Sequence, residues 1–277
     1  MRSIRQTVQI SSAQKLIAGA HIVKARKMLD HSKLYHGRIR LAVASVLGDC
    51  EAKNKYLYVG QEIKRRGLLI ISADRGLAGG YKHNLMKLAT ETMAEKPVAK
   101  LLCVGHVDYG KFARMGAPID SDFRYPVEIP TLHNAREMAE RMVSMFENGE
   151  VDCFNIIYTT FKTAAHMTPS LERLFPLSPE ALGEPRVHYA EYLPSADDVL
   201  EVLIPKYLKG YLFGCLVEAW ICELRSRISA MDGAIKNGNE MLAKLSLQYN
   251  RVRQRAITEE ISEIVAGAES MEEDDEI

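Results

Sequence analysis

The sequence lacks the short motifs that mark common catalytic and metal sites. It contains no H-E-x-x-H, no G-x-S-x-G and no G-x-x-x-x-G-K-S/T, and its eight histidines show no pairing with cysteine at metal-ligand spacing. Its five cysteines include no C-x-x-C pair and lie mostly in apolar surroundings, which indicates free thiols in a reducing compartment. We therefore expect no metal, no cofactor and no catalytic activity of the isolated chain.

Long apolar runs and an export signal are also missing. Two basic residues open the chain, but polar residues interrupt the apolar segment that a signal peptide needs. The longest strongly apolar stretch, residues 211–224, is shorter than the roughly 20 residues that span a bilayer, and it contains Glu218 and Glu223. We expect any membrane association to occur through partner proteins.

The chain has no net charge, because 36 Lys and Arg balance 36 Asp and Glu. This balance argues against a global attraction to nucleic acid or anionic lipid. Residues 1–66 are nevertheless strongly basic, and the segment from Thr258 onward is acidic. The basic segment lacks the interleaved aromatics that stack on bases, so we interpret it as a solvated helix face and expect no nucleic-acid partner. We interpret the acidic end as a solvated tail.

Proline is absent from both ends of the chain, which divides the sequence into three zones. Between Arg2 and Lys64 apolar residues recur at helical intervals, and we predict one long helix in residues 1–66. After Pro205, the last proline, apolar residues recur mainly every three, four and seven positions to about Ser270. This seam predicts a second long helix in residues 196–277, antiparallel to the first and paired with it.

The middle zone, residues 67–195, has a different texture. Short apolar runs alternate with helical stretches, the runs being 68–72, 100–104 and 155–160 and the helical stretches 82–95 and 133–147. This alternation predicts a globular α/β domain with a mostly parallel sheet flanked by helices. The expected fold is thus an α/β domain inserted between the two helices of a long antiparallel coiled coil.

A glycine-rich turn at residues 72–81, S-A-D-R-G-L-A-G-G-Y, joins the first expected strand to the first expected helix. A turn of this kind can cradle a phosphate. Its spacing fits neither G-x-x-x-x-G-K-S/T nor G-x-G-x-x-G, so we interpret it as a structural turn. A nucleotide-binding α/β enzyme with helical extensions remains the alternative of another class.

Polar residues interrupt the apolar seam of the C-terminal helix. They are Asn237, Asn239, Asn250, Arg251, Arg253, Gln254 and Arg255. Periodicity alone leaves two interpretations open, because these side chains either are solvated or face a surrounding partner that offers hydrogen bonds and carboxylates.

Four sequence blocks resemble the gamma subunits of F-type ATP synthases. Residues 257–268 are similar to the signature I-T-x-E-x-x-D/E-x-x-x-G-A, residues 226–231 to S-R-M-x-A-M, residues 249–254 to Y-N-x-x-R-Q, and residues 72–80 to S-x-D-R-G-L-C-G-G. The blocks follow the family's order.

The resemblance implies a Rossmann-like α/β domain carrying the coiled coil, and a mechanical, non-catalytic function as the central rotor shaft. It implies a hexamer of alpha and beta subunits around the shaft, contacts of the globular domain with the epsilon subunit and the membrane c-ring, and a peripheral position at the cytoplasmic face of the cell membrane. By the same resemblance, ion flow turns the rotor and ATP chemistry belongs to the beta subunits. Matching family positions assigns contacts with alpha and beta to Arg227, Gln254, Thr258 and Glu260.

The N-terminal helix departs from the family pattern. The family reads Q-K-I-T-x-A-M where residues 14–20 read Q-K-L-I-A-G-A, and Ala78 replaces the usual cysteine of the turn. A gamma-like subunit of a divergent second rotary ATPase is therefore an alternative. A coiled-coil scaffold unrelated to ATPases is a third.

Overall fold

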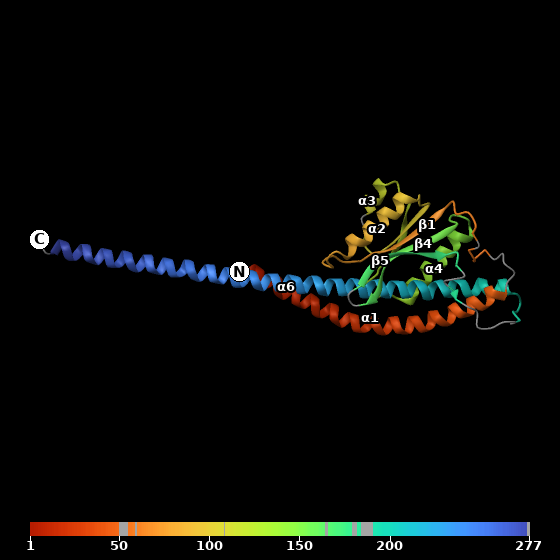
Figure 1. Cartoon of the computed structure of the whole chain (residues 1–277), viewed down its shortest axis with the longest axis horizontal. Helices are drawn as coiled ribbons and strands as arrows, with labels where there is room; N and C mark the ends of the chain where they lie inside the picture. The colour runs from red at the N-terminus through yellow and green to blue at the C-terminus, as the bar shows by residue number, and fades with distance from the viewer. Residues whose placement is uncertain are drawn as a thin grey trace. The chain divides into compact units, whose positions relative to one another are not determined.

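The computed structural model describes residues 1–49, 55–58, 60–107, 109–163, 166–178, 182–183 and 191–275, with side chains up to Val265 in the last range. Its helices are α1 (Arg2–Asp49), α2 (Tyr81–Glu95), α3 (Tyr109–Arg114), α4 (Leu132–Glu147) and α6 (Ala196–Asp275). Its strands are β1 (Arg66–Ile71), β2 (Lys100–Val104), β3 (Ile119–Tyr125), β4 (Cys153–Thr163) and β5 (His166–Phe175) (Figure 1). The predicted α/β class and both long helices are confirmed.

The chain divides into two compact units. One unit comprises Met1–Leu16 and Ala230–Ile277, and the other comprises Ile17–Ser229. Helices α1 and α6 contribute segments to both units, and the sheet lies in the second unit.

The sheet has five strands in the order β3-β2-β1-β4-β5. Strands β1 to β4 pair in parallel, as predicted, and β5 pairs antiparallel to β4. The two edge strands, β3 and β5, were not predicted. Strand β3 buries Phe123 among charged neighbours, and β5 carries Pro169 and Glu172, so neither strand shows the apolar run of a central strand.

Helices cover both faces of the sheet (Figure 1). Along β1, Leu68 and Ile70 pack with residues of α2 and α3, whereas Leu69 and Ile71 pack with residues of α4 and of α1 and α6. This alternation follows from the two-residue period of a strand, in which successive side chains point to opposite faces.

Within the unit Ile17–Ser229, α1 and α6 run antiparallel. His21 lies edge-on against Trp220, with ring centroids 5.6 Å apart, and Tyr35 lies against Gly210. A Cβ atom at Gly210 would lie 2.9 Å from Cε1 of Tyr35, so the absence of a side chain there allows the close approach of the two helices.

The unit Met1–Leu16 with Ala230–Ile277 shows the same antiparallel direction. Lys15 forms an ion pair with Asp232 at 2.6 Å, and a Cβ atom at Gly238 would lie 2.5 Å from Cγ2 of Val8. Both charged side chains are about half exposed, so packing rather than the ion pair dominates this pairing. The predicted antiparallel pairing is confirmed within each unit.

The predicted end of the N-terminal helix was less accurate. Helix α1 ends at Asp49 instead of near Lys64, residues 50–54 lie outside the described part, and Tyr56 is buried against Phe146 and Phe175. Helix α6 begins at Ala196, the first residue of the predicted range, and contains Pro205. The signal for this start was Ser195, whose hydroxyl oxygen accepts a hydrogen bond from the Asp198 backbone N–H at 3.2 Å.

The close contact of Gly67 in β1 with the buried ring of Phe154 in β4 gives a test of the sheet packing. We expect Gly67→Ala to lower the free energy of unfolding by about 2 kcal/mol, because the new methyl group overlaps an aromatic ring that has no room to move. Urea unfolding followed by the fluorescence of Trp220, the single tryptophan, measures this change. As the control, Gly37→Ala in α1 meets no atom within 4 Å and is expected to stabilise by up to about 1 kcal/mol. Equal effects of the two substitutions would contradict the prediction.

Candidate functional site: the glycine-rich turn and helix α6

The glycine-rich turn between β1 and α2 is held by its own side chains. Leu77 and Gly79 have positive φ values of 61° and 55°. The carboxylate of Asp74 accepts hydrogen bonds from the backbone N–H groups of Val127 and Glu128 at 2.8 and 2.6 Å. An ion pair of 2.9 Å between Arg75 and Glu128 adds a second tie to the segment after β3. The turn is therefore a rigid element.

The turn is docked on helix α6. The hydroxyl of Ser226 donates a hydrogen bond to the carbonyl oxygen of Ala78 at 2.7 Å, and the hydroxyl of Tyr81 donates to the carbonyl oxygen of Ala219 at 3.1 Å. Between these two bonds, Cys222 is fully buried in an apolar cluster with Ala78 and Tyr81. We call this contact between residues 74–81 and residues 219–227 the turn–α6 joint.

The joint lies where an α/β enzyme of this topology would bind a nucleotide. In open α/β sheets, ligands bind beyond the carboxyl ends of the strands at the point where the strand order reverses, which here lies between β1 and β4. Helix α6 lies beyond both strands, since Glu218 accepts a hydrogen bond from the backbone N–H of Phe161 in β4 at 2.6 Å and Ser226 bonds the turn after β1. The chain's own helix thus fills this position, which favours the structural interpretation of the turn.

Arg227, one of the four residues assigned by sequence, belongs to the joint. Its guanidinium pairs with Glu223 one helical turn earlier and donates to the carbonyl oxygen of Gly76 at 3.4 Å. The Arg227 side chain is 13% exposed and that of Glu223 is 3% exposed. Burial raises the pKa of Glu223, and the neighbouring Arg227 opposes that rise. In the chain alone, the structure therefore places Arg227 against the turn.

The other three assigned residues lie on α6 in the unit Met1–Leu16 with Ala230–Ile277, and all three are exposed. The hydroxyl of Thr258 donates to the backbone carbonyl of Gln254 at 2.9 Å, so these two residues share one helix face. Glu260 follows Thr258 by two positions, which places it on a different face. The structure thus brings Gln254 and Thr258 together on one face of α6, and Glu260 lies on a different face.

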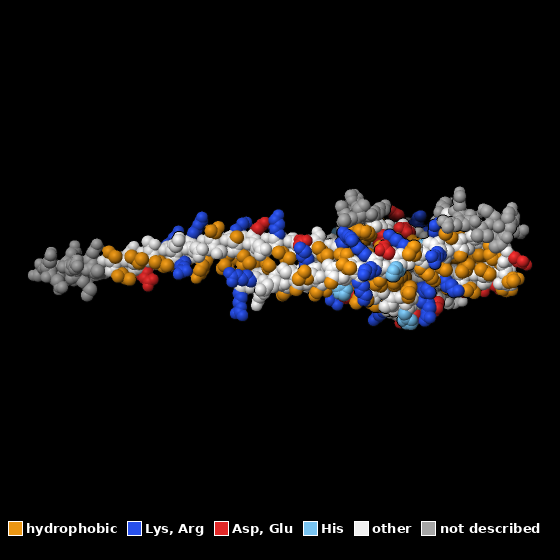
Figure 2. All heavy atoms as spheres, turned by 90° about the horizontal axis from the view of Figure 1, so that it is seen from below, with side chains coloured by type: hydrophobic (Ala, Val, Ile, Leu, Met, Phe, Trp, Pro, Cys, Tyr) orange, Lys and Arg blue, Asp and Glu red, His pale blue; other side chains and the backbone are white. Residues whose placement is uncertain are grey.

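The end of α6 exposes many large apolar side chains among its polar ones. They are Met241, Leu247, Tyr249, Val252, Ile257, Ile261, Ile264 and Val265, each at least 44% exposed. Figure 2 shows hydrophobic side chains interleaved with charged ones along this stretch. All seven polar residues that interrupt the seam, from Asn237 to Arg255, are exposed as well.

Helix α1, which the sequence predicted to pair with the C-terminal helix, covers only part of the α6 seam. Helix α1 begins at Arg2, and Val8 already lies against Gly238. In an antiparallel pair, the six residues before Val8 reach less than two further turns of α6. The apolar residues from Leu247 onward are therefore too far along α6 for α1 to cover.

A partly buried acid, Glu218, lies beside the joint and was missed as a functional candidate. Burial raises the pKa of its carboxyl group, while the Phe161 N–H bond and the charge of Lys33 oppose the rise and the charge of Glu172 adds to it. The only signal in the sequence was an acid within the apolar stretch 211–224.

The described residues contain no group of three or more His, Cys, Asp or Glu placed to hold a metal ion. None of the helices in the described part is long and apolar enough to cross a membrane.

The chain is similar to known proteins over nearly its whole length. Residues 1–271 match the family model described as ATP synthase. The ATP synthase gamma chain of Ruminiclostridium cellulolyticum is 37% identical over 283 residues, covering 98% of this chain and 96% of that protein. The gamma chain of Staphylococcus carnosus is 31% identical over 278 residues, with the same coverage of the two chains.

Solved structures show the same fold at low sequence identity. A chain in the cryo-EM structure of the Euglena gracilis mitochondrial ATP synthase (OSCP/F1/c-ring, rotational state 3) superposes with a TM-score of 0.63 at 14% identity, covering 100% of this chain and 96% of that one. A chain of the Tetrahymena thermophila mitochondrial ATP synthase (central stalk/c-ring) superposes with a TM-score of 0.58 at 16% identity, covering 81% and 99%.

Because the pKa of Glu218 is raised in the folded chain, we predict that ionisation of this carboxyl group lowers the stability of the folded chain as pH rises. A carboxyl group whose pKa is higher in the folded than in the unfolded chain is protonated in both states at low pH, and its contribution to stability falls as pH rises from about 4.5 through the folded-state pKa. Glu218→Gln keeps an acceptor for the Phe161 N–H and removes the ionisation. We expect the urea midpoint of Glu218→Gln minus that of the unmodified chain to be more positive at pH 8 than at pH 4.5.

Glu201→Gln, an exposed substitution on the same helix, is the matched control for Glu218→Gln. An equal shift of the Glu218→Gln midpoint at both pH values would show that ionisation of Glu218 does not affect folding.

Proposed function

The chain belongs to the gamma-subunit family of F-type ATP synthases, and we propose that it turns as the central shaft inside such a complex. Gamma chains are non-catalytic stalk subunits, and ATP chemistry takes place on the beta subunits. The chain is accordingly a subunit of an enzyme complex and not an enzyme by itself. We propose that it couples ion-driven rotation of a membrane c-ring to ATP synthesis or hydrolysis.

The uncovered end of α6 is the observation that supports a surrounding partner. Seven large apolar side chains from Leu247 to Val265 are exposed there, on the part of α6 that α1 does not reach. An apolar surface of this extent marks a protein interaction site. The interleaved Asn, Gln and Arg residues suit a surrounding partner that offers hydrogen bonds and carboxylates as well as apolar contacts. We propose a hexamer of alpha and beta subunits as that partner.

We propose a division of labour among three segments of the chain. Residues 1–66 and 196–277 form the shaft, and residues 67–195 form a globular domain that binds the epsilon subunit and the c-ring. The turn–α6 joint ties the domain to the shaft through Ser226, Arg227 and Tyr81. A torque applied to the domain thereby reaches α6, whose surface differs from face to face. Rotation then shifts each beta subunit among states of different nucleotide affinity.

Contacts with alpha and beta are proposed at Gln254, Thr258 and Glu260, which are exposed. Their side chains offer hydrogen bonds that form in some rotary positions and break in others. For Arg227 we propose a dual role, because its guanidinium has five N–H donors and the contacts with Glu223 and Gly76 use only part of them.

We further propose a peripheral position at the cytoplasmic face of the cell membrane, reached through the c-ring. The alternative, a gamma-like subunit of a divergent second rotary ATPase, is favoured by one stretch of α1. Leu16 and Ile17, in the segment that departs from the family pattern, are 74% and 58% exposed. A hexamer with its own matching surface would suit them.

Reconstitution tests the proposed function directly. Alpha and beta subunits from the same source are purified with and without this chain, and their ATPase rate and inhibitor sensitivity are measured. We expect a stoichiometric complex and a marked rise in cooperative ATP turnover when the chain is added. Absence of any complex would contradict the proposal, whereas a complex with only one of two hexamers from that source would identify which rotary ATPase the chain serves.

Substitutions at the end of α6 test the proposed contacts. We expect Thr258→Ala and Glu260→Ala each to lower coupled ATP synthesis severalfold, on the basis of about 1 kcal/mol for each lost hydrogen bond. Glu259→Ala is the matched control, because Glu259 is exposed and adjacent but stands at a variable position of the signature. Equal losses in Glu259→Ala and Glu260→Ala would argue against a specific contact at Glu260.

A further inference from the structure

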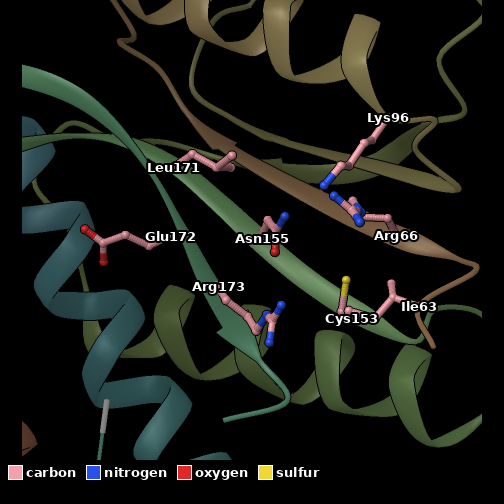
Figure 3. A pocket seen from close by; sticks show the side chains of 8 residues that line it. All are labelled: Ile63, Arg66, Lys96, Cys153, Asn155, Leu171, Glu172 and Arg173. Atoms are coloured by element: carbon pink, nitrogen blue, oxygen red, sulfur yellow. The ribbon is translucent and has the colours of Figure 1, made fainter. Parts of the chain in front are cut away.

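A cavity of about 260 Å³ opens on the sheet beside the end of α2, away from the turn–α6 joint (Figure 3). Three cationic side chains line it, namely Arg66, Lys96 and Arg173. Cys153 and Asn155 of β4 contribute to the lining between them. The cavity does not enter the proposed rotor function, and its charge calls for a separate explanation.

Strand register brings these residues together from distant parts of the sequence. Arg66, the first residue of β1, pairs with Cys153 of β4, and Asn155 of β4 pairs with Arg173 of β5. Lys96 follows the last residue of α2 as its C-cap. In the view of Figure 3, the nitrogen-bearing ends of Lys96 and Arg66 point toward one another, with Arg173 on the other side of Asn155. Two strands and one helix end thus direct positive charge into one cavity, and β4 between the strands supplies uncharged lining.

These charges have no acidic partner within the described part of the chain. No ion pair there involves Arg66, Lys96 or Arg173. Glu172 is the one acid in the lining, but its carboxylate points toward α6 and accepts a hydrogen bond from the hydroxyl of Tyr211 at 2.6 Å (Figure 3). The strand alternation that turns Arg173 toward Asn155 turns Glu172 to the opposite face.

The cationic groups are also partly positioned in advance. The guanidinium of Arg173 lies 3.7 Å from the ring centroid of Tyr58, which restricts its motion. Lys96 is favoured by the carbonyl groups at the end of α2, but this helix effect does not account for Arg66 or Arg173. Cys153 is 1% exposed, so part of the wall is dry, which strengthens electrostatic attraction to an anion.

From this geometry we propose that the cavity binds a phosphate group, either as free phosphate or as the phosphoryl group of a nucleotide. Two guanidinium groups and one ammonium group supply donors on several sides, and the amide of Asn155 supplies a neutral one. A tetrahedral dianion accepts from all of them at once, whereas a single carboxylate has two oxygens and one charge. The site is distinct from the glycine-rich turn.

Amide chemical shifts of the full-length chain test the proposal. The chain is titrated with sodium phosphate, and in a second arm with ADP, while sodium chloride keeps the ionic strength constant. We expect saturable shifts at Arg66, Cys153 and Asn155. Arg66→Gln and Lys96→Gln should each weaken binding about tenfold, the effect of losing one charge-assisted hydrogen bond.

Lys87→Gln is the matched control, because Lys87 lies on the exposed side of the same helix α2 and pairs with Glu91. It removes the same charge and should change phosphate binding less than twofold. ADP binding at least tenfold tighter than phosphate at the same amides would identify a nucleotide as the source of the phosphoryl group, and equal binding would identify free phosphate. Shifts that do not saturate, or an equal loss of binding in Lys87→Gln and Lys96→Gln, would overturn the proposal.

Discussion

Burial of the middle of α6 is the interaction on which the rest of the unit Ile17–Ser229 depends. Leu212, Leu216, Trp220 and Ile221 are at most 1% exposed, and each contributes roughly 1.5–3 kcal/mol by leaving water. These side chains join α1, α4 and one face of the sheet in a single apolar cluster. The glycine-rich turn, the partly buried acid Glu218 and the pairing of α1 with α6 all take their positions from this helix.

The same helix presents two opposite kinds of surface. In its middle, Glu223 is buried and Glu218 partly buried, and both find partners within the chain. At its end, apolar groups such as Val252 and Ile264 are exposed. The middle of α6 thus places polar groups inside the chain's own fold, whereas the end of α6 exposes apolar groups that the chain does not cover. This distribution indicates that the end of α6 binds a partner. The family assignment and the physical reading of α6 therefore agree without depending on each other.

The central elements could be predicted because their residues follow a strict period. The apolar runs of β1, β2 and β4 and the amphipathic helices α2 and α4 were all visible in the sequence. Strands β3 and β5 were not, since edge strands bury fewer side chains and tolerate charge and proline. The end of α1 at Asp49 was also missed, because the apolar residues that follow it, such as Tyr56, pack under the domain instead of along the helix.

The candidate sites also differ in how far the sequence alone could predict them. Gln254, Thr258 and Glu260 were assigned by matching a motif, because they are close in sequence, and their contacts remain a prediction. The docking of Arg227 on Gly76 spans 151 positions and required the fold. The cationic cavity required strand register as well, since Arg66 and Arg173 are neighbours only through β4. Sequence patterns find sites on one element, and sites assembled from several elements emerge from the sheet order.

The spacing of the bonds in the turn–α6 joint has a mechanical consequence. The bonds to Ala219, Ser226 and Arg227 lie along about 12 Å of helix, more than two turns, on one face of α6. A twisting moment on α6 then loads these bonds together, in shear, and no single bond at one end bears the whole force. Bonds loaded in parallel share the force and break together, whereas bonds loaded one after another break one at a time. The joint therefore resists rotation of α6 against the turn and does not act as a hinge.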